Sequence, residues 1–335
     1  MRLSSEQIKS ITLGASRITP EGDGLAFYRH SEGEEALYRK TDDRYHLRSL
    51  SSSGICLSFL TDSRSLTIAA TLSPGSSRGY YAFDLFVNQR MIDSLCNFDA
   101  AELPAAYAGV KLSLGDAEKT FALGEGEKEV CLYFPFSVKT TLRELSLDDG
   151  ARVTPIKPKM RLLCYGDSIT QGYDVLHPSS KYTTRLARHL GAEEINKGIG
   201  GAIFIPELID EAEDLSPDLI TVAYGTNDWS SLSRERFTAG CDAFLSKLRA
   251  RYAETEILVI TPIWRKDHTE EREFGRFADA GEIIKACAKK HQRMRVIDGF
   301  DLVAHDENLF ADLYLHPNDE GFGQYFEGLI RSAAL

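Results

Sequence analysis

The sequence lacks the long apolar runs and the basic excess that mark two large classes of protein. No stretch approaches the ~18 consecutive apolar residues of a membrane-spanning helix. The first residues, Met-Arg-Leu-Ser-Ser-Glu-Gln, contain no apolar segment of the kind found in secretion signals. The 335 residues carry a formal net charge of −11, which offers no basic face to nucleic acid or to an anionic membrane. We therefore expect a cytoplasmic protein that binds neither.

Cysteine is also sparse, and its spacing is irregular. Metal sites need clustered ligands, and small secreted scaffolds need dense cysteines. The six cysteines form no such pattern and lie mostly in apolar segments, at positions 56, 96, 131, 164, 241 and 287. This distribution predicts buried thiols and implies no structural metal.

Convincing helical periodicity is scarce in residues 1–150, where alternation of period two dominates. Apolar side chains alternate with their neighbours over 66–72, 81–88 and 130–136, and turn-forming clusters occupy 73–77 and 124–126. Short alternating runs separated by turns predict strands with one buried face each. Because a chain of this length is expected to form two domains, we predict a β-sandwich of jelly-roll type over 1–150.

The pattern changes after a short boundary. Residues 151–159 contain Pro155 and Pro158, which favour an extended connector that neither sheet nor helix absorbs easily. From residue 160 onward, apolar strand candidates alternate with helical periods; the strand candidates are 161–165, 193–197, 219–224, 256–261 and 294–298. This order predicts right-handed βαβ units and a flavodoxin-like three-layer α/β/α domain over 160–335, with a parallel sheet.

Four polar segments follow the predicted strands or precede the last helix. They are Gly-Asp-Ser-Ile at 166–169, Asn-Lys-Gly-Ile-Gly-Gly-Ala at 196–202, Gly-Thr-Asn-Asp-Trp at 225–229 and Asp-Leu-Tyr-Leu-His-Pro-Asn at 312–318. Ligands of open α/β folds bind at the carboxyl ends of the parallel strands. We therefore expect these four segments to share one edge of the sheet.

The residue types in these segments complement one another chemically. Ser168 needs a base to become a nucleophile, and His316 is the natural choice. The Ser168 N–H, the Gly201 N–H and the Asn227 amide can donate hydrogen bonds to a tetrahedral oxyanion. A carboxylate shortly before the histidine can fix its tautomer, and Asp312 is the nearest one.

With these four blocks in this order, residues 160–335 resemble the SGNH (GDSL-type) hydrolase superfamily. The resemblance implies that Ser168 is the nucleophile, that Gly201 and Asn227 complete an oxyanion hole and that His316 is the base. One position departs from the family pattern, which places the acid three residues before the histidine, where this chain has Leu313. Either the loop absorbs a one-residue offset and Asp312 serves, or a backbone carbonyl orients His316 and the enzyme works as a dyad.

The order of a β-sandwich and then an SGNH domain looks like that of carbohydrate esterases that remove acetyl groups from sugars. It is also similar to two-domain SGNH esterases and acyltransferases. The resemblance therefore implies a serine esterase that cleaves small acyl esters, with an O-acetylated carbohydrate as the preferred substrate and no metal or organic cofactor. An acyltransferase or a short-chain lipase could use the same serine. A non-catalytic carbohydrate-binding protein and a flavodoxin-like nucleotide or flavin binder are the rivals from other classes, and homo-oligomerisation stays open.

Four aromatic residues near these blocks are candidates for a substrate pocket. They are Trp229, Trp264, Tyr173 and Tyr314. Aromatic faces suit sugar rings, but core packing explains the same residues nearly as well. For the neighbouring polar residues we expect structural roles, with Asn318 as the cap of the last helix and Asp167 and Asp228 as anchors of their loops.

Overall fold

The computed structural model describes residues 1–335, and its carboxyl-terminal half is a three-layer α/β/α sandwich. Five parallel strands have the order β13 (Ala192–Asn196), β12 (Met160–Gly166), β14 (Leu219–Ala223), β15 (Glu256–Ile260) and β18 (Met294–Ile297). This arrangement confirms the predicted fold class, and each strand begins and ends within one residue of the range expected from its apolar run.

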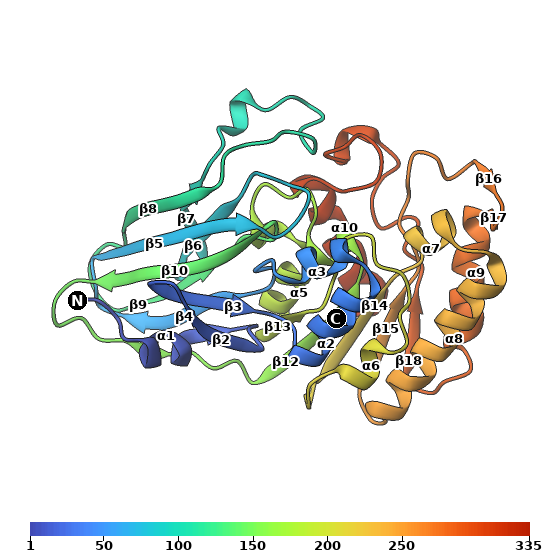
Figure 1. Cartoon of the computed structure of the whole chain (residues 1–335), viewed down its shortest axis with the longest axis horizontal. Helices are drawn as coiled ribbons and strands as arrows, with labels where there is room; N and C mark the ends of the chain where they lie inside the picture. Colours follow the sequence, from blue (N-terminus) through green and yellow to red (C-terminus); the bar gives the residue numbers. More distant parts are fainter.

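Helices cover both faces of this sheet, as Figure 1 shows. One face packs against α6 (Leu208–Glu211), α8 (Arg234–Arg251) and α9 (Phe277–Ala288). The other face packs against α5 (Tyr182–Leu190) and α10 (Asp319–Ala333). The short helices α4 (Ser168–Gln171) and α7 (Thr226–Ser231) directly follow strands at the carboxyl edge. No helix of the chain is both long and apolar enough to cross a membrane.

The amino-terminal half contains two antiparallel sheets that enclose a common apolar core. The first has the order β1 (Thr12–Leu13), β4 (Cys56–Thr61), β9 (Lys128–Tyr133), β6 (Ala82–Val87) and β7 (Arg90–Cys96). The second has the order β2 (Arg17–Glu21), β3 (Gly24–Tyr28), β10 (Val138–Leu147), β5 (Ser65–Pro74) and β8 (Gly115–Ala122). All six cysteines of the chain are free thiols, and four of them are buried.

Two features of this half differ from the sequence prediction. Three helices, α1 (Ser5–Ile11), α2 (Glu32–Thr41) and α3 (Asp43–Ser49), were not expected. The first two begin with capping boxes at Ser4 and Ser31, a local signal that periodicity alone does not detect. In addition, part of the connector joins a sheet, because Thr154 and Pro155 form β11, which pairs with β4. Proline is tolerated at such outer positions since its ladder hydrogen bond is dispensable there.

A buried ion cluster joins the two halves at Lys197, within the second polar block. The Lys197 ammonium lies 2.7 Å from a carboxylate oxygen of Glu34 in α2 and 2.9 Å from one of Glu213. It also donates to the Arg29 carbonyl, and the Lys197 and Glu34 side chains are both 0% exposed. A charge buried this deeply is tolerated only because it is paired and hydrogen-bonded.

We expect the substitution Lys197→Met to lower the free energy of unfolding by about 3–5 kcal/mol, because it strands the Glu34 carboxylate in the interior. Urea unfolding measures this change. The matched control is Lys247→Met, which removes an exposed ion pair to Asp210 and is expected to change stability by no more than about 1 kcal/mol. Equal effects of the two substitutions on the free energy of unfolding would contradict the stabilising role of the buried Lys197–Glu34 pair.

Candidate active site

Ser168 lies where β12 turns into the short helix α4. Gly166 ends the strand, and a Cβ at this position would collide with the side chain of Thr170. Asp167 caps α4 by accepting a hydrogen bond from the Ile169 N–H at 2.9 Å. Burial raises the pKa of Asp167 to about 6. Ser168 is therefore the first residue of α4, and its hydroxyl lies at the carboxyl edge of the sheet.

His316 reaches Ser168 from the loop before α10. Its Nε2 lies 2.9 Å from Ser168 Oγ, and its Nδ1 lies 2.7 Å from Asp312 Oδ2. Asn318 caps α10 by accepting from the Gly321 N–H, as the sequence indicated. The structure thus brings the three side chains into one hydrogen-bonded line, and the partners of His316 Nδ1 are carboxylates.

The conformation of Leu313 explains how Asp312 reaches the histidine from four residues away. Leu313 has a positive φ of 54°, so the chain turns tightly after Asp312. Asp312 Oδ1 accepts hydrogen bonds from the N–H groups of Tyr314, Leu315 and His316. Burial raises the pKa of Asp312, but its hydrogen bond and charge interaction with His316, together with these N–H groups, outweigh burial and bring the pKa to about 2.

A second carboxylate, which the sequence reading missed, also faces His316. Asp174 Oδ2 lies 3.3 Å from His316 Nδ1, and Asp174 is fully buried with a positive φ of 75°. Arg78 pairs with it through two nitrogens, and the Tyr80 hydroxyl donates to it at 2.7 Å. No local motif marks this aspartate, because both partners lie more than 90 positions earlier in the chain.

Gly201 lies in a loop that the amino-terminal half holds in place. The Tyr45 hydroxyl in α3 donates to the Gly201 carbonyl at 2.9 Å, and an Arg48 guanidinium nitrogen donates to the Gly200 carbonyl at 2.6 Å. Gly201 has a φ of +78°, and a Cβ there would lie only 2.9 Å from Arg48 Nη1. This backbone angle is one that residues with a side chain rarely adopt, so it favours glycine at position 201.

Asn227, at the start of α7, lies beside this loop. Its side-chain Nδ2 donates to the carbonyl of Ala202, the residue after Gly201, at 3.0 Å. A primary amide has two N–H donors, so one remains for a ligand. The next residue, Asp228, accepts from the Phe204 N–H and acts as the loop anchor that the sequence indicated. Burial raises the pKa of Asp228 to about 7.

Arg265 connects two of the polar blocks and was not singled out by the sequence reading. It is buried, forms an ion pair with Asp267 and donates to the carbonyl and hydroxyl oxygens of Thr226. It also reaches the Tyr314 hydroxyl at 3.4 Å. The guanidinium thereby ties the start of α7 to the loop that carries His316.

The four aromatic candidates take different positions. The Tyr173 ring lies 5.6 Å from the His316 ring, and Tyr314 is half-buried beside Arg265. Trp229 is 1% exposed and packs on the edge of the Phe277 ring, while Trp264 is buried against Phe310. The tryptophans therefore pack in the core, which was the alternative reading. Tyr173 is 3% exposed and also belongs to the core, so Tyr314 is the one partly exposed candidate beside the catalytic loop.

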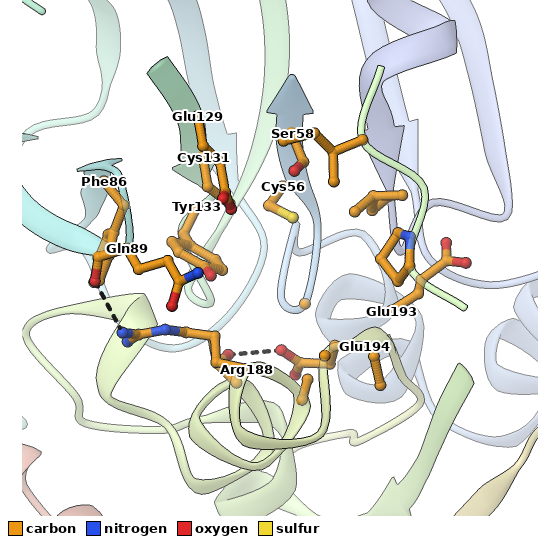
Figure 2. A pocket seen from close by; sticks show the side chains of 18 residues that line it. Cys56, Ser58, Phe86, Gln89, Glu129, Cys131, Tyr133, Arg188, Glu193 and Glu194 are labelled. Atoms are coloured by element: carbon orange, nitrogen blue, oxygen red, sulfur yellow. Dashed lines mark hydrogen bonds between the residues drawn. The ribbon is translucent and has the colours of Figure 1, made fainter. Parts of the chain in front are cut away.

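A separate cavity lies between the two halves of the chain. Figure 2 shows side chains that line it, including Cys56 and Cys131 of the sandwich and Arg188 of α5. Its volume is about 220 Å³, and neither Ser168 nor His316 contributes to its walls.

Only one group of side chains could share a metal ion. The ligand atoms of Asp174, Asp312 and His316 lie within 4.8 Å of one another. The Arg78 guanidinium already supplies a positive charge beside Asp174. This group therefore gives no independent argument for a metal.

Comparison with known proteins finds a family match in the carboxyl-terminal half of the chain. Residues 164–323 match the GDSL-like Lipase/Acylhydrolase family. No curated protein matches the chain. Many solved structures share its fold at low sequence identity.

Three of these solved structures illustrate the kinds of protein that share the fold. The salicylyl-acyltransferase SsfX3 from a tetracycline biosynthetic pathway has a TM-score of 0.78 at 23% identity, over 96% of this chain and 93% of that one. A candidate GDSL-like lipase from Bacteroides ovatus has a TM-score of 0.78 at 19% identity, over 100% and 97%. A family two carbohydrate esterase from Clostridium thermocellum, solved with cellohexaose, has a TM-score of 0.66 at 13% identity, over 96% and 99%. Residues 164–323 therefore match the model of a GDSL-like lipase/acylhydrolase domain, and a β-rich amino-terminal half precedes them.

Proposed function

We propose that this protein is a serine esterase that hydrolyses small acyl esters, with O-acetyl groups on a carbohydrate as the preferred substrates. The observation that carries the proposal is the hydrogen-bonded line from Asp312 through His316 to Ser168, with distances of 2.7 and 2.9 Å. A serine, an imidazole and a carboxylate in this order form a nucleophile with its base and the group that orients the base.

The geometry supports a two-step mechanism. Asp312 holds the proton of His316 on Nδ1, so Nε2 can accept the proton of Ser168 as Oγ attacks the ester carbonyl. His316 then protonates the departing alcohol, and water resolves the acyl-enzyme by the same route. Burial lowers the pKa of His316, but its hydrogen bond to Asp312 and the charges of Asp174 and Asp312 outweigh burial and raise it. A raised pKa favours the proton transfer from serine.

The oxyanion of the intermediate needs donors that are already in place. In this proposal it is bound by the N–H groups of Ser168 and Gly201 and by the free N–H of the Asn227 amide. The bonds from α3 to the Gly200 and Gly201 carbonyls support this role because they fix the loop before substrate arrives.

One observation favours an acetyl group on a sugar as the substrate. Several solved structures of this fold are carbohydrate esterases, including an acetyl xylan esterase. These likenesses support the substrate class by analogy of fold.

The proposal is tested with a panel of 4-nitrophenyl esters from acetate to octanoate and with acetylated sugars. We expect the highest kcat/KM for acetyl esters and release of acetate from acetylated sugars. A preference for long chains would contradict the sugar-deacetylase assignment while leaving serine catalysis intact.

A second candidate function is acyl transfer by the same serine to an alcohol acceptor. The likeness to SsfX3, an acyltransferase, favours this alternative. It requires that an added acceptor alcohol speed the breakdown of the acyl-enzyme and yield a new ester. Under hydrolysis alone, the acceptor leaves the rate of acyl-enzyme breakdown unchanged.

We expect Asp312→Asn to lower kcat between about tenfold and 10⁴-fold, because the amide stabilises the wrong tautomer of His316. Steady-state kinetics measure the effect against His316→Ala, which is expected to abolish activity. A loss below about tenfold for Asp312→Asn, with His316→Ala inactive, would rule out the triad role of Asp312.

A further inference from the structure

The geometry points to Asp174 as a second carboxylate for His316, a positioning residue whose charge is moderated by Arg78 from the amino-terminal half. This inference rests on the proposed function in that His316 is taken as the base. It assigns to the β-sandwich a part in the chemistry of the histidine that the SGNH blocks alone do not require.

The first support is the position of Asp174 relative to the imidazole. Nδ1 has a single hydrogen, and Asp312 accepts the hydrogen bond that it donates, at 2.7 Å. Asp174 Oδ2 lies 3.3 Å from the same nitrogen, within ion-pair distance but with no hydrogen bond. Asp174 therefore acts on His316 through its charge, and it stabilises the imidazolium that forms when Ser168 loses its proton.

The second support is the way in which two carboxylates are kept together. Like charges this close repel each other unless each is compensated. Asp312 is compensated by three backbone N–H groups. Asp174, which is fully buried, is compensated by Arg78 through its Nε and Nη2 and by the Tyr80 hydroxyl.

The third support is that the groups around Asp174 come from a different part of the chain. Arg78 and Tyr80 lie in the connection between β5 and β6, and Tyr107 donates to the Asp174 carbonyl from the segment before β8. Arg78 is itself close enough to His316 to lower the proton affinity of the imidazole. The sandwich thus supplies both the carboxylate's counter-charge and the anchor of its backbone.

In the alternative interpretation, Asp174 is only a structural anchor between the two halves. The direction in which the His316 pKa changes distinguishes this anchor role from the charge role. The charged groups that act on His316 are Asp312, Asp174, Arg78 and Asp167. If charge is the mechanism, removing Asp174 and removing Arg78 must move the His316 pKa in opposite directions. Loss of an anchor has no reason to do so.

The test is an NMR titration of the imidazole in the full chain labelled at histidine, in the presence of a metal chelator. The His316 signal is assigned by its loss in His316→Gln. We expect Asp174→Asn to lower the His316 pKa by about one unit and Arg78→Gln to raise it by about half a unit. Tyr107→Phe is the matched control, because it removes the anchor to the Asp174 carbonyl without changing a charge, and we expect no shift.

The pH dependence of hydrolysis provides the second measurement. The acid limb of kcat/KM reports the pKa of the base in the free enzyme. It is therefore expected to move to lower pH in Asp174→Asn and to higher pH in Arg78→Gln, while Arg78→Lys keeps it near the wild-type position. In Asp174→Asn, kcat is expected to fall about tenfold with little change in KM, which corresponds to the loss of one pKa unit.

The outcomes separate this inference from the proposed function. Shifts in the same direction, or no shift in either variant, would overturn the role of Asp174 even if the enzyme hydrolyses esters. Opposite shifts in an inactive wild-type protein would leave the role of Asp174 standing and contradict the esterase. If either single variant fails to fold, the double variant Asp174→Asn with Arg78→Gln takes its place, because it leaves neither charge unpaired. A His316 pKa in the double variant equal to that of wild type would likewise overturn the inference.

Discussion

The substitution Ser168→Ala is expected to lower kcat/KM for 4-nitrophenyl acetate by at least about 10⁴-fold, an effect as large as that of removing His316. Residues of a serine–histidine pair act as a unit, so removal of one costs nearly as much as removal of both, and only binding and the oxyanion donors still contribute to the rate. Ser168 Oγ is the atom that His316 Nε2 contacts at 2.9 Å. The residual rate is measured at high enzyme concentration.

Two controls accompany this experiment. Ser246→Ala, on the exposed face of α8, removes an equivalent hydroxyl far from the site and is expected to leave the rate unchanged. A fluorophosphonate should add one adduct to the wild-type chain and none to Ser168→Ala, as read by mass spectrometry. Absence of any adduct on the wild-type serine would instead favour the non-catalytic carbohydrate-binding protein.

The second large effect is expected at Asn227. Removing one oxyanion donor costs about 10²–10³-fold in kcat, so Asn227→Ala should lose that much. Asn227→Asp should lose more, because it keeps the shape of the side chain but places a carboxylate where negative charge develops. Measurement of kcat and KM for both variants with an acetyl ester tests this expectation.

The alternative role of Asn227 is to tether the Gly201 loop through the Ala202 carbonyl. A tether predicts a lower melting temperature, with an effect on kcat that is no larger for aspartate than for alanine. The oxyanion role therefore fails if the two variants have the same kcat and differ from wild type mainly in stability.

The sequence was sufficient to predict the parallel sheet and the meeting of the four polar blocks. Strands buried on both faces have near-continuous apolar runs, and the carboxyl ends of parallel strands necessarily share an edge. The contact between Ser168 and His316, 148 positions apart, could be expected for this reason. The untested part of that prediction is the role of each side chain in catalysis.

The features that were missed depend on information that no local pattern contains. The helices α2 and α3 have mainly polar sequences, and α2 buries Glu34 and Tyr38 where an apolar stripe would be expected. The approach of Asp312 to His316 depends on the backbone angle of Leu313. The pairing of Asp174, in the loop after α4, with Arg78, in the connection between β5 and β6, joins positions 96 residues apart, and only the tertiary structure can show it.

The bonds from α3 to the Gly201 loop also bear on the order in which the site can form. Synthesis runs from the amino terminus, so Tyr45 leaves the ribosome 156 residues before Gly201, and an amino-terminal domain generally folds first. The loop therefore emerges next to donors that are already in position, and the sandwich acts as a template for the part of the site made after it.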